Sequence, residues 1–434
     1  MSSARGGLLS PPRRRGRPPA PPSTASDIRR RTSGTSVGGF PLTNVVVLEA
    51  GAATALILLA AAGGLWPVSA VVVALAVALG CTRWHGRWIP QWIVIVTRFL
   101  SRTRVRRSAQ VPSQADVTQL EHGAESKLTG PDDARVALLR LLVDDLVIAD
   151  GTDHEQQPVG LAWHKGTWTA ALRIDPIPAM VSPVGAHTEM PLAALADCLQ
   201  DRGVVLDGIG VMWHCYPGSS RLPADSAAVA AYNEVLGPLP AVAHRSTWVT
   251  VRLDPRRCPS AVRERGGGVA GAHRALLGAL SRVRGALELA GLSARVLSTD
   301  ELLRAAISAA ELSQAAGRGE PVELHERWRR VHSGGIAHTS YGIGSWPSDA
   351  GKLDSLTSIR ALSTTVSLAL SPAPEAGRVG MRGVVRVSAR TSDELQGADD
   401  RVRALSASSD IRLERLNGQQ AAAIAATLPI GGAA

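Results

Sequence analysis

The most constraining feature of this sequence is an apolar stretch near its N-terminus. From Leu42 to Gly64 the only charged side chain is Glu49. These 23 residues would form a helix about 34 Å long, enough to cross the hydrocarbon core of a bilayer. The stretch therefore predicts a transmembrane helix.

A second apolar run follows after a short turn rich in glycine. It covers Trp66–Thr82, or 17 residues, and would be only about 25 Å long as a helix. Trp66 at one end, and Trp84 and Trp88 at the other, lie where amphipathic rings favour the headgroup layer. We predict a second transmembrane helix with these tryptophans as interface anchors; the alternative is that they pack on neighbouring protein.

The charge distribution argues against a nucleic-acid partner. The net charge is +10, but residues 1–43 hold eight arginines and one acid, and residues 83–107 hold seven arginines and no acid. Because these two flanks carry +14 together, the remainder carries −4. Basic residues at both outer flanks of a helix pair place both flanks on the cytoplasmic side. We therefore predict a multi-pass membrane protein with both termini and its soluble region in the cytoplasm; the resemblance described below implies that the membrane is the bacterial inner (plasma) membrane.

A basic amphipathic segment follows the helix pair. Residues Trp92–Leu100 are apolar but too short to span a bilayer, and Arg98, Arg102 and Arg106 recur at four-residue spacing. This pattern predicts an interfacial helix whose arginines face anionic lipid. A solvated linker helix is the alternative. A cleaved signal peptide is disfavoured, because the basic leader is too long and a second apolar run follows.

The rest of the chain divides by composition. Residues 1–41 form a Pro/Arg-rich leader that we expect to be disordered, residues 42–83 the helix pair, and residues 84–130 the basic helix and a linker. Residues 131–431 alternate between strand-like and helix-like patterns, which predicts a layered α/β domain, either single or split into two subdomains. The sequence shows no obvious repeat.

Several elements of this domain can be placed by pattern. Alternating residues predict a β-hairpin around Lys165-Gly166, and Leu312–Trp346 reads as an elaborated loop. The expected strands are 159–163, 167–174, 209–216, 248–253, 294–297, 364–370, 384–389 and 411–415, and the expected helices are 191–202, 269–290, 300–310, 393–406 and an alanine-rich one at the C-terminus.

The sequence contains no pattern that predicts a reaction. Gly266, Gly268 and Gly271 match G-x-G-x-x-G, but a dozen residues separate them from the strand that ends at Leu253, so a flexible loop is favoured over a nucleotide site. The four cysteines lack paired spacing, and the eleven histidines are dispersed. We therefore predict no catalytic residue, no metal and no cofactor.

The order of these features resembles that of the EccE family, a membrane component of the actinobacterial type VII (ESX) secretion system. The resemblance covers roughly residues 42–431. The segments that carry it are the helix pair with its arginine-rich exit, VGLAWHKGTWTAALRI (159–174), PLAALA (191–196), LGPLPAVAHRSTWVTVRLDP (236–255), RGGG (265–268) and ATLPIG (426–431).

This resemblance implies a non-enzymatic structural subunit at the periphery of an inner-membrane secretion complex. It also implies a cytoplasmic α/β domain and EccB, EccC and EccD as partners, with EccC as the ATPase. The long proline-rich leader departs from the family. The alternative hypothesis is a membrane-tethered enzyme, similar to a glycosyltransferase or binding a nucleotide, motivated by the α/β pattern and the glycines near residue 266.

Overall fold

The computed structural model describes most of the chain outside the N-terminal leader. The described residues are 36–108, 133–175, 189–217, 244–313, 321–373 and 378–431, apart from gaps at 38–39, 62–63, 65, 85–86, 348–349 and 360; residues 227, 231 and 234 are described singly. The prediction of disorder falls on residues 1–41, of which all but 36–37 and 40–41 lie outside this set.

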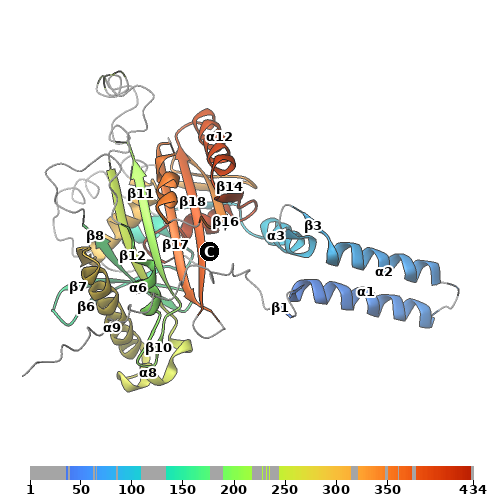
Figure 1. Ribbon diagram of the computed structural model, residues 1–434, viewed down its shortest axis with the longest axis horizontal. Helices are drawn as coiled ribbons and strands as arrows, with labels where there is room; N and C mark the ends of the chain where they lie inside the picture. The colour runs from blue at the N-terminus through green and yellow to red at the C-terminus, as the bar shows by residue number, and fades with distance from the viewer. Residues whose placement is uncertain are drawn as a thin grey trace, which may run out of the picture.

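Two apolar helices extend from the body of the molecule as a pair (Figure 1). They are α1 (Leu42–Ala61) and α2 (Trp66–Cys81), and α1 follows a two-residue hairpin, β1 (Ser36–Val37) with β2 (Phe40–Pro41). Among the described residues, α1 is the one helix long and apolar enough to cross a membrane, while α2 is shorter. A second small hairpin, β3 (Arg83–Trp84) with β4 (Arg87–Trp88), leads into α3 (Ile89–Ser101) at the base of the pair.

The body is built on one 13-stranded sheet in which every described pair is antiparallel. In hydrogen-bonding order its strands are β5 (Val105–Arg107), β14 (Glu323–Glu326), β15 (Val331–Ser333), β16 (Ile336–Ser345), β18 (Val379–Ala389), β17 (Ser363–Pro372), β11 (Gly208–Tyr216), β12 (His244–Leu253), β8 (Thr167–Ile174), β7 (Pro158–His164) and β6 (Val147–Thr152), with β13 (Ala294–Val296) beside β8 and β19 (Arg412–Arg415) beside β16.

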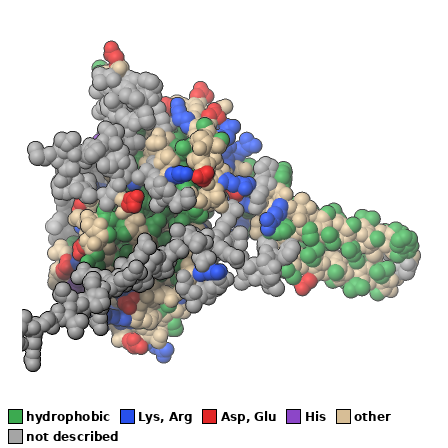
Figure 2. Space-filling view, viewed as in Figure 1, with side chains coloured by type: hydrophobic (Ala, Val, Ile, Leu, Met, Phe, Trp, Pro, Cys, Tyr) green, Lys and Arg blue, Asp and Glu red, His purple; other side chains and the backbone are tan. Residues whose placement is uncertain are grey.

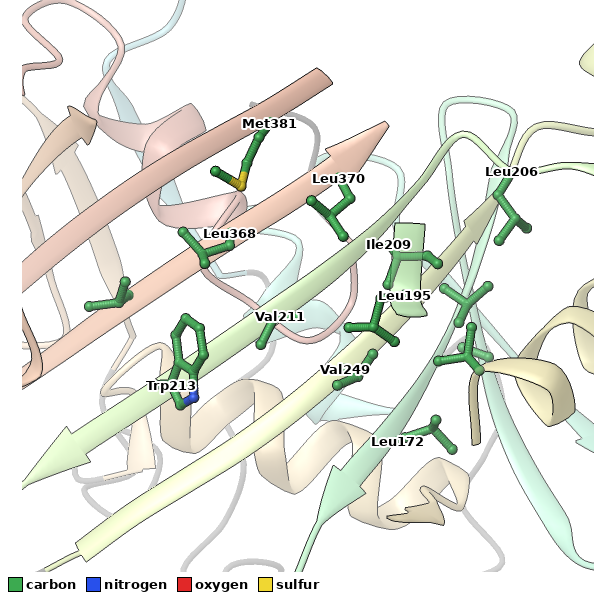
Figure 3. Close-up of a cluster of buried hydrophobic side chains, with 14 of the residues drawn as sticks. Leu172, Leu195, Leu206, Ile209, Val211, Trp213, Val249, Leu368, Leu370 and Met381 are labelled. Carbon is green, nitrogen blue, oxygen red and sulfur yellow. The ribbon is translucent and has the colours of Figure 1, made fainter. Parts of the chain in front are cut away.

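Helices cover both faces of the sheet, so the domain has three layers. One face packs on α6 (Leu192–Asp197), α8 (Pro259–Glu264), α9 (Gly268–Leu289), η5 (Ala350–Ser358) and α12 (Ser392–Ser408). The other packs on α5 (Ala134–Leu139), α10 (Thr299–Ala309) and α13 (Gln420–Ala425). Figure 3 shows the first core, in which Leu172, Val249, Val211 and Leu368 project from four neighbouring strands. A short hairpin, β9 (Gln200–Asp201) with β10 (Val204–Val205), and the turn η4 (Pro255–Arg257) complete the domain.

The sheet consists of two halves with the same topology. The first half (158–309) runs β7-β8-β11-β12-α9-β13-α10, and the second half (331–425) runs β15-β16-β17-β18-α12-β19-α13. In each half the second strand pairs with the fourth on one side, and with the first and fifth on the other. The halves meet where β11 pairs with β17, and a pseudo-twofold axis passes through the Met212–Ser367 pair.

The register of the two halves agrees residue for residue. Leu297 N donates to Ala171 O at 3.0 Å in the first half, and Leu416 N donates to Ser340 O at 3.0 Å in the second. The equivalent ladder pairs are Leu172 with Val249 and Val296, and Tyr341 with Val385 and Arg415. The fold therefore contains a structural repeat that the sequence does not display.

The turns that open the two halves also agree. Lys165 and Gly166 have φ of 48° and 85°, and Gly334 and Gly335 have φ of 58° and 83°. Positive φ at both central residues is the conformation that two-residue β-hairpins favour, because its twist matches that of the strands. The predicted Lys165-Gly166 hairpin is thus confirmed, and it has an unpredicted counterpart.

Most predicted elements of the domain are present within one to four residues of their expected bounds. The prediction of mixed helix and sheet is confirmed, with antiparallel pairing throughout the described sheet. The interpretation of Leu312–Trp346 as an elaborated loop is wrong, because these residues contain β14, β15 and β16. Their polar side chains masked the strand pattern: His338, Thr339 and Ser340 are all buried between the two helical layers.

Candidate membrane-proximal interface

Small residues let the two apolar helices pack closely against each other. A Cβ added at Gly51 would clash with the Cβ of Ala76, and one added at Gly80 would lie 3.1 Å from the Leu48 side chain. Asn44 is fully buried, and its Nδ2 donates to Gly80 O at 2.8 Å. Close approach at small residues and a buried interhelical hydrogen bond are typical of helix pairs in membranes. In the structure, α1 and α2 therefore form a tight helical hairpin.

The outward sides of this hairpin are apolar and exposed. Figure 2 shows hydrophobic side chains over the visible face of both helices. The large exposed ones are Val46, Leu56, Ile57, Leu59, Trp66, Val68, Val71, Val73, Leu75 and Val77. A contiguous apolar surface of this kind marks a membrane or protein contact, because water would be an unfavourable neighbour.

An aromatic cluster joins α3 to the sheet at the base of the hairpin. The Trp92 ring lies 6.4 Å from that of Trp84 and 6.3 Å from that of Trp328, and Phe99 meets Trp328 edge-on at 5.1 Å. Trp92 Nε1 also donates to Trp84 O at 2.9 Å. Such tilted and edge-on contacts stabilise aromatic pairs beyond simple burial. They hold the small hairpin β3–β4, α3 and the β14–β15 turn together.

A buried ion pair fixes the chain where it leaves α3. Arg102 Nη2 lies 2.5 Å from Glu326 Oε1 and donates to Gly418 O at 2.7 Å. The Glu326 side chain is only 2% exposed, and its Oε1 also accepts from Ala421 N at 3.0 Å, at the start of α13. Burial raises the pKa of Glu326, while Arg102 and the amide of Ala421 oppose that rise. One carboxylate thus links the end of α3, strand β14 and helix α13.

Two further arginines fasten β5 to the domain. Arg106 Nη1 lies 2.6 Å from Asp144 Oδ1 and donates to Leu141 O at 3.2 Å. Arg107 Nε lies 2.6 Å from Glu323 Oε1, on the strand that β5 pairs with. Residues 105–107, predicted to lie in the segment before the domain, therefore add a strand to its sheet.

The predicted anchors occupy two kinds of environment. Trp66 lies exposed where α2 begins, at the far end of the hairpin, and Trp84 is exposed near its base. Trp88 is partly covered by the Arg83 guanidinium, 4.1 Å from its ring centroid. The Arg98 side chain is exposed, and its guanidinium has no bonding partner among the described residues.

Arg102 and Arg106, by contrast, have protein partners that their spacing did not indicate. Both guanidinium groups bind carboxylates of the domain rather than projecting on the exposed side of α3. Of the three arginines at four-residue spacing, only Arg98 lies within a helix, because α3 ends at Ser101. The structure therefore separates Arg98 and the tryptophans from Arg102 and Arg106, which attach the end of α3 and β5 to the domain.

Sequence reasoning missed the β14–β15 turn as part of this region. The turn contains Arg327, Trp328, Arg329 and Arg330, a basic run interleaved with an aromatic side chain. Arginines next to a tryptophan could have indicated an interface in the sequence, but these residues lay within the segment that was interpreted as a loop. Its contact with α3 depends on pairing between β5 and β14, which are far apart in the chain.

The glycine run and the acidic pairs have structural surroundings in the described residues. The glycine run near residue 266 follows helix α8 rather than a strand, and Gly271 packs against Val262 O. No group of three metal-ligating side chains occurs in the part of the chain that the structure describes. Asp133 caps α5 and pairs with Arg135, and Asp399 pairs with Arg415 at 2.6 Å, so these acids have structural partners.

Comparison with known proteins agrees with these features. A family described as "Putative type VII ESX secretion system translocon, EccE" matches residues 241–343, which run from β12 in the first half to β16 in the second. Residues 241–343 of this chain therefore carry an EccE domain. Its EccE domain thus includes the turn that contacts α3.

Individual members of the family differ in how much of this chain they match. The ESX-5 secretion system protein EccE5 of Mycobacterium marinum is 27% identical over 301 residues, which cover 64% of this chain and 67% of that protein. The ESX-1 secretion system protein EccE1 of Mycolicibacterium smegmatis is 36% identical over 72 residues, 17% of this chain and 16% of its own length. EccE1 of Mycobacterium tuberculosis is 24% identical over 241 residues, 53% of this chain and 43% of its own. The matched part of the chain therefore spans less than half of each of these two EccE1 proteins.

Proposed function

We propose that this chain is a non-enzymatic structural subunit of an inner-membrane type VII secretion complex, assembling with EccB, EccC and EccD. Its EccE domain makes it a component of an ESX secretion system. The observation that supports a structural role is the attachment of the sheet to the apolar hairpin. The ion pair of Arg102 with Glu326 and the contact between Trp92 and Trp328 form this attachment. Such an arrangement holds a soluble domain at a fixed place on a membrane.

In this proposal, α1 and α2 cross the membrane as a hairpin. The 20 residues of α1 are about 30 Å long, which matches the hydrocarbon core. The 16 residues of α2 reach about 24 Å, so local thinning of the bilayer would accommodate them. Trp66 would lie in one headgroup layer, with Trp84, Trp88 and Arg98 in the other.

The same proposal places the soluble domain in the cytoplasm. Seven arginines follow α2 within residues 83–107, and eight precede α1, so both flanks satisfy the positive-inside rule. Fusing a fluorescent protein and, separately, alkaline phosphatase to the C-terminus of the full chain tests this orientation. We expect fluorescence without phosphatase activity; active phosphatase would overturn the topology.

A pull-down tests the assembly role. Tagged full-length chain, extracted in mild detergent, should recover the ATPase EccC together with EccB and EccD. Gly51→Leu should reduce that recovery several-fold, because the new side chain collides with Ala76 and separates the helices. Recovery of the wild-type chain alone would contradict the proposal.

The matched control for this experiment is Gly278→Leu. Gly278 lies on α9, and a Cβ added there meets open space. The same chemical change on the domain should therefore leave recovery of the partners unchanged. An equal loss with both variants would show that the hairpin has no specific part in assembly.

A further inference from the structure

The β14–β15 turn places three arginines beside the base of the hairpin. Arg327 N donates to Arg330 O at 2.8 Å and closes the turn. Between them, Trp328 points at α3, where it meets Trp92 and Phe99. Because Trp328 is fixed against α3, the arginines on either side of it are held next to the point where the chain leaves the hairpin.

These arginines form an uncompensated positive surface. Arg327 and Arg329 are exposed and Arg330 is half-buried, and none of the three guanidinium groups has an ion pair within the residues that the structure describes. The nearby acids are already engaged: Glu326 with Arg102, and Glu323 with Arg107. Figure 2 shows basic side chains gathered between the domain and the apolar hairpin.

The neighbouring titratable group responds to this charge. After burial, the largest causes that lower the pKa of His332 are the charges of Arg330 and Arg327. These two charges therefore disfavour the protonated form of His332.

Helix α3 adds an apolar stripe and one more free cation to the same region. Ile93, Val96 and Leu100 share one side of α3 and are 48%, 38% and 60% exposed. Arg98 is exposed on the same helix. An exposed apolar stripe on a helix that packs against a basic turn, next to an apolar hairpin, matches the boundary between acyl chains and headgroups.

We propose that Arg327, Arg329 and Arg330, together with Arg98, bind the phosphate groups of anionic phospholipids in the leaflet that faces the domain. This inference rests on the proposed membrane insertion of the hairpin. The occupant is a lipid because the basic turn packs on α3, whose exposed apolar stripe a soluble anion would leave uncovered. Contact at the turn, far in sequence from the hairpin, fixes how the sheet is oriented relative to the bilayer.

Lipid-dependent thermal stabilisation of the full chain tests this site. The chain in dodecyl maltoside is titrated with phosphatidylglycerol, and the melting temperature is followed, since a ligand that binds only the folded state raises it. With each arginine near an anionic surface contributing on the order of fivefold in affinity, Arg327→Gln/Arg329→Gln/Arg330→Gln should shift the titration midpoint about 100-fold. An unchanged midpoint would overturn the proposal.

The control carries the same three changes on the far side of the domain. Arg202, Arg256 and Arg263 are exposed near α8, away from the hairpin in Figure 1. Their triple glutamine variant should titrate like the wild type. If the turn variant melts lower without lipid, the double variant Arg327→Gln/Arg329→Gln, which changes only exposed side chains, replaces it and should still shift the midpoint more than tenfold.

Other occupants give different results in the same assay. Stabilisation by phosphatidylcholine would show that headgroup charge is irrelevant, and stabilisation by inorganic phosphate alone would show an anion site without lipid. Polyglutamate stabilising as well as phosphatidylglycerol would indicate an acidic protein segment. Each of these outcomes contradicts the lipid assignment. The pull-down is repeated with the turn variant. If this variant still recovers the secretion partners, the result of the lipid titration bears on the lipid site only, and the proposed function stands whichever way the titration turns out.

Discussion

The two halves of the sheet share a backbone but differ in what they enclose and what they touch. On the face covered by α10 and α13, the second half buries Arg386, His338 and Ser340 where the register places Thr250, Thr169 and Ala171 in the first. Next to β15 lies β14, which pairs in turn with β5, the strand that leads back to the hairpin. Next to β7 lies β6, which is the last strand at the other edge of the described sheet. Two halves with the same strand register can therefore differ both in their buried side chains and in the segments that pair with their outer strands.

The equivalent helices of the two halves also begin differently. Helix α10 is capped locally by Ser298, whose side chain accepts from Glu301 N, in a capping box. Helix α13 has no side-chain cap of its own and takes the carboxylate of Glu326, which also binds Arg102. The start of α13 therefore takes its cap from a distant carboxylate, whereas the cap of α10 is local in sequence.

The largest expected effect is at the buried guanidinium of Arg386. It donates to Thr365 Oγ1 at 2.9 Å and to Ala309 O, at the end of α10, and burial lowers its pKa to about 10. Arg386→Ala should lower the free energy of unfolding by about 4 kcal/mol, because a cavity and an unpaired helix terminus remain. Arg386→Met, which fills the space, should cost about half as much.

The matched change in the first half is Thr250→Ala, which should cost only about 1 kcal/mol. Urea denaturation followed by tryptophan fluorescence measures all three variants. If Arg386→Ala and Thr250→Ala lowered the free energy of unfolding equally, the buried side chains of the two halves would contribute the same stability, contrary to the comparison.

The next effect concerns the junction carboxylate. Glu326→Ala should cost about 3 kcal/mol, because Arg102 and the amide of Ala421 lose a buried partner. Glu326→Gln keeps an acceptor oxygen and removes the burial cost that raises the pKa of Glu326, so it should cost about 1 kcal/mol. Denaturation curves at neutral pH distinguish the two variants. If Glu326→Ala were as stable as the wild type, the contact between Arg102, Glu326 and Ala421 would add no stability.

A smaller effect appears only in acid. Burial, then the charges of Arg386 and His332, hold the pKa of the fully buried His338 well below its usual value of 6.5. Because the folded state disfavours the protonated ring, its stabilising contribution is present above about pH 6.5 and is lost as the pH falls. Lowering the pH to 5 should cost about 2 kcal/mol through this one residue.

The control for this pH dependence is His338→Thr, which copies the residue at the equivalent position of the first half. His164, His273 and His332 also have lowered pKa values and titrate in both proteins. The measured quantity is therefore the difference between the two pH profiles. Parallel profiles from pH 7 to pH 5 would rule out His338 as the source.

The smallest effect is at the local cap. Ser298→Ala should cost about 1 kcal/mol, because one amide at the start of α10 loses its acceptor. Hydrogen exchange should localise the change to α10 and leave α13 unaffected. Spread of the effect to α13 would mean that the two helices are energetically coupled despite their different caps.

Sequence patterns predicted those parts of the fold where burial follows a simple period. Trp248–Leu253 alternates and forms the end of β12, and 269–290 has helical spacing and forms α9. The strand β16 failed this test because it is buried on both faces and carries His338, Thr339 and Ser340 in succession. The repeat was invisible because equivalent positions, such as Thr250 and Arg386, no longer share chemistry.

The candidate interface was predictable only where it is local in sequence. Trp84 and Arg98 stand out because they follow an apolar run directly. Trp328 is brought to them by the pairing of β5 with β14, and no spacing rule reports a contact between residues so distant in the chain. Arg102 and Arg106 illustrate the same point, since their carboxylate partners lie on segments remote from α3.

The short connection between α3 and β5 has a mechanical consequence. Only residues 102–104 separate the end of α3 from the start of β5, and Arg102 is bound to Glu326 and Gly418. There is no length of free chain here that could act as a swivel. Any rotation of α1 and α2 about their long axes must therefore turn the whole sheet through the same angle. If the pair crosses the membrane as proposed, the domain would then show each neighbour in the membrane plane a constant side.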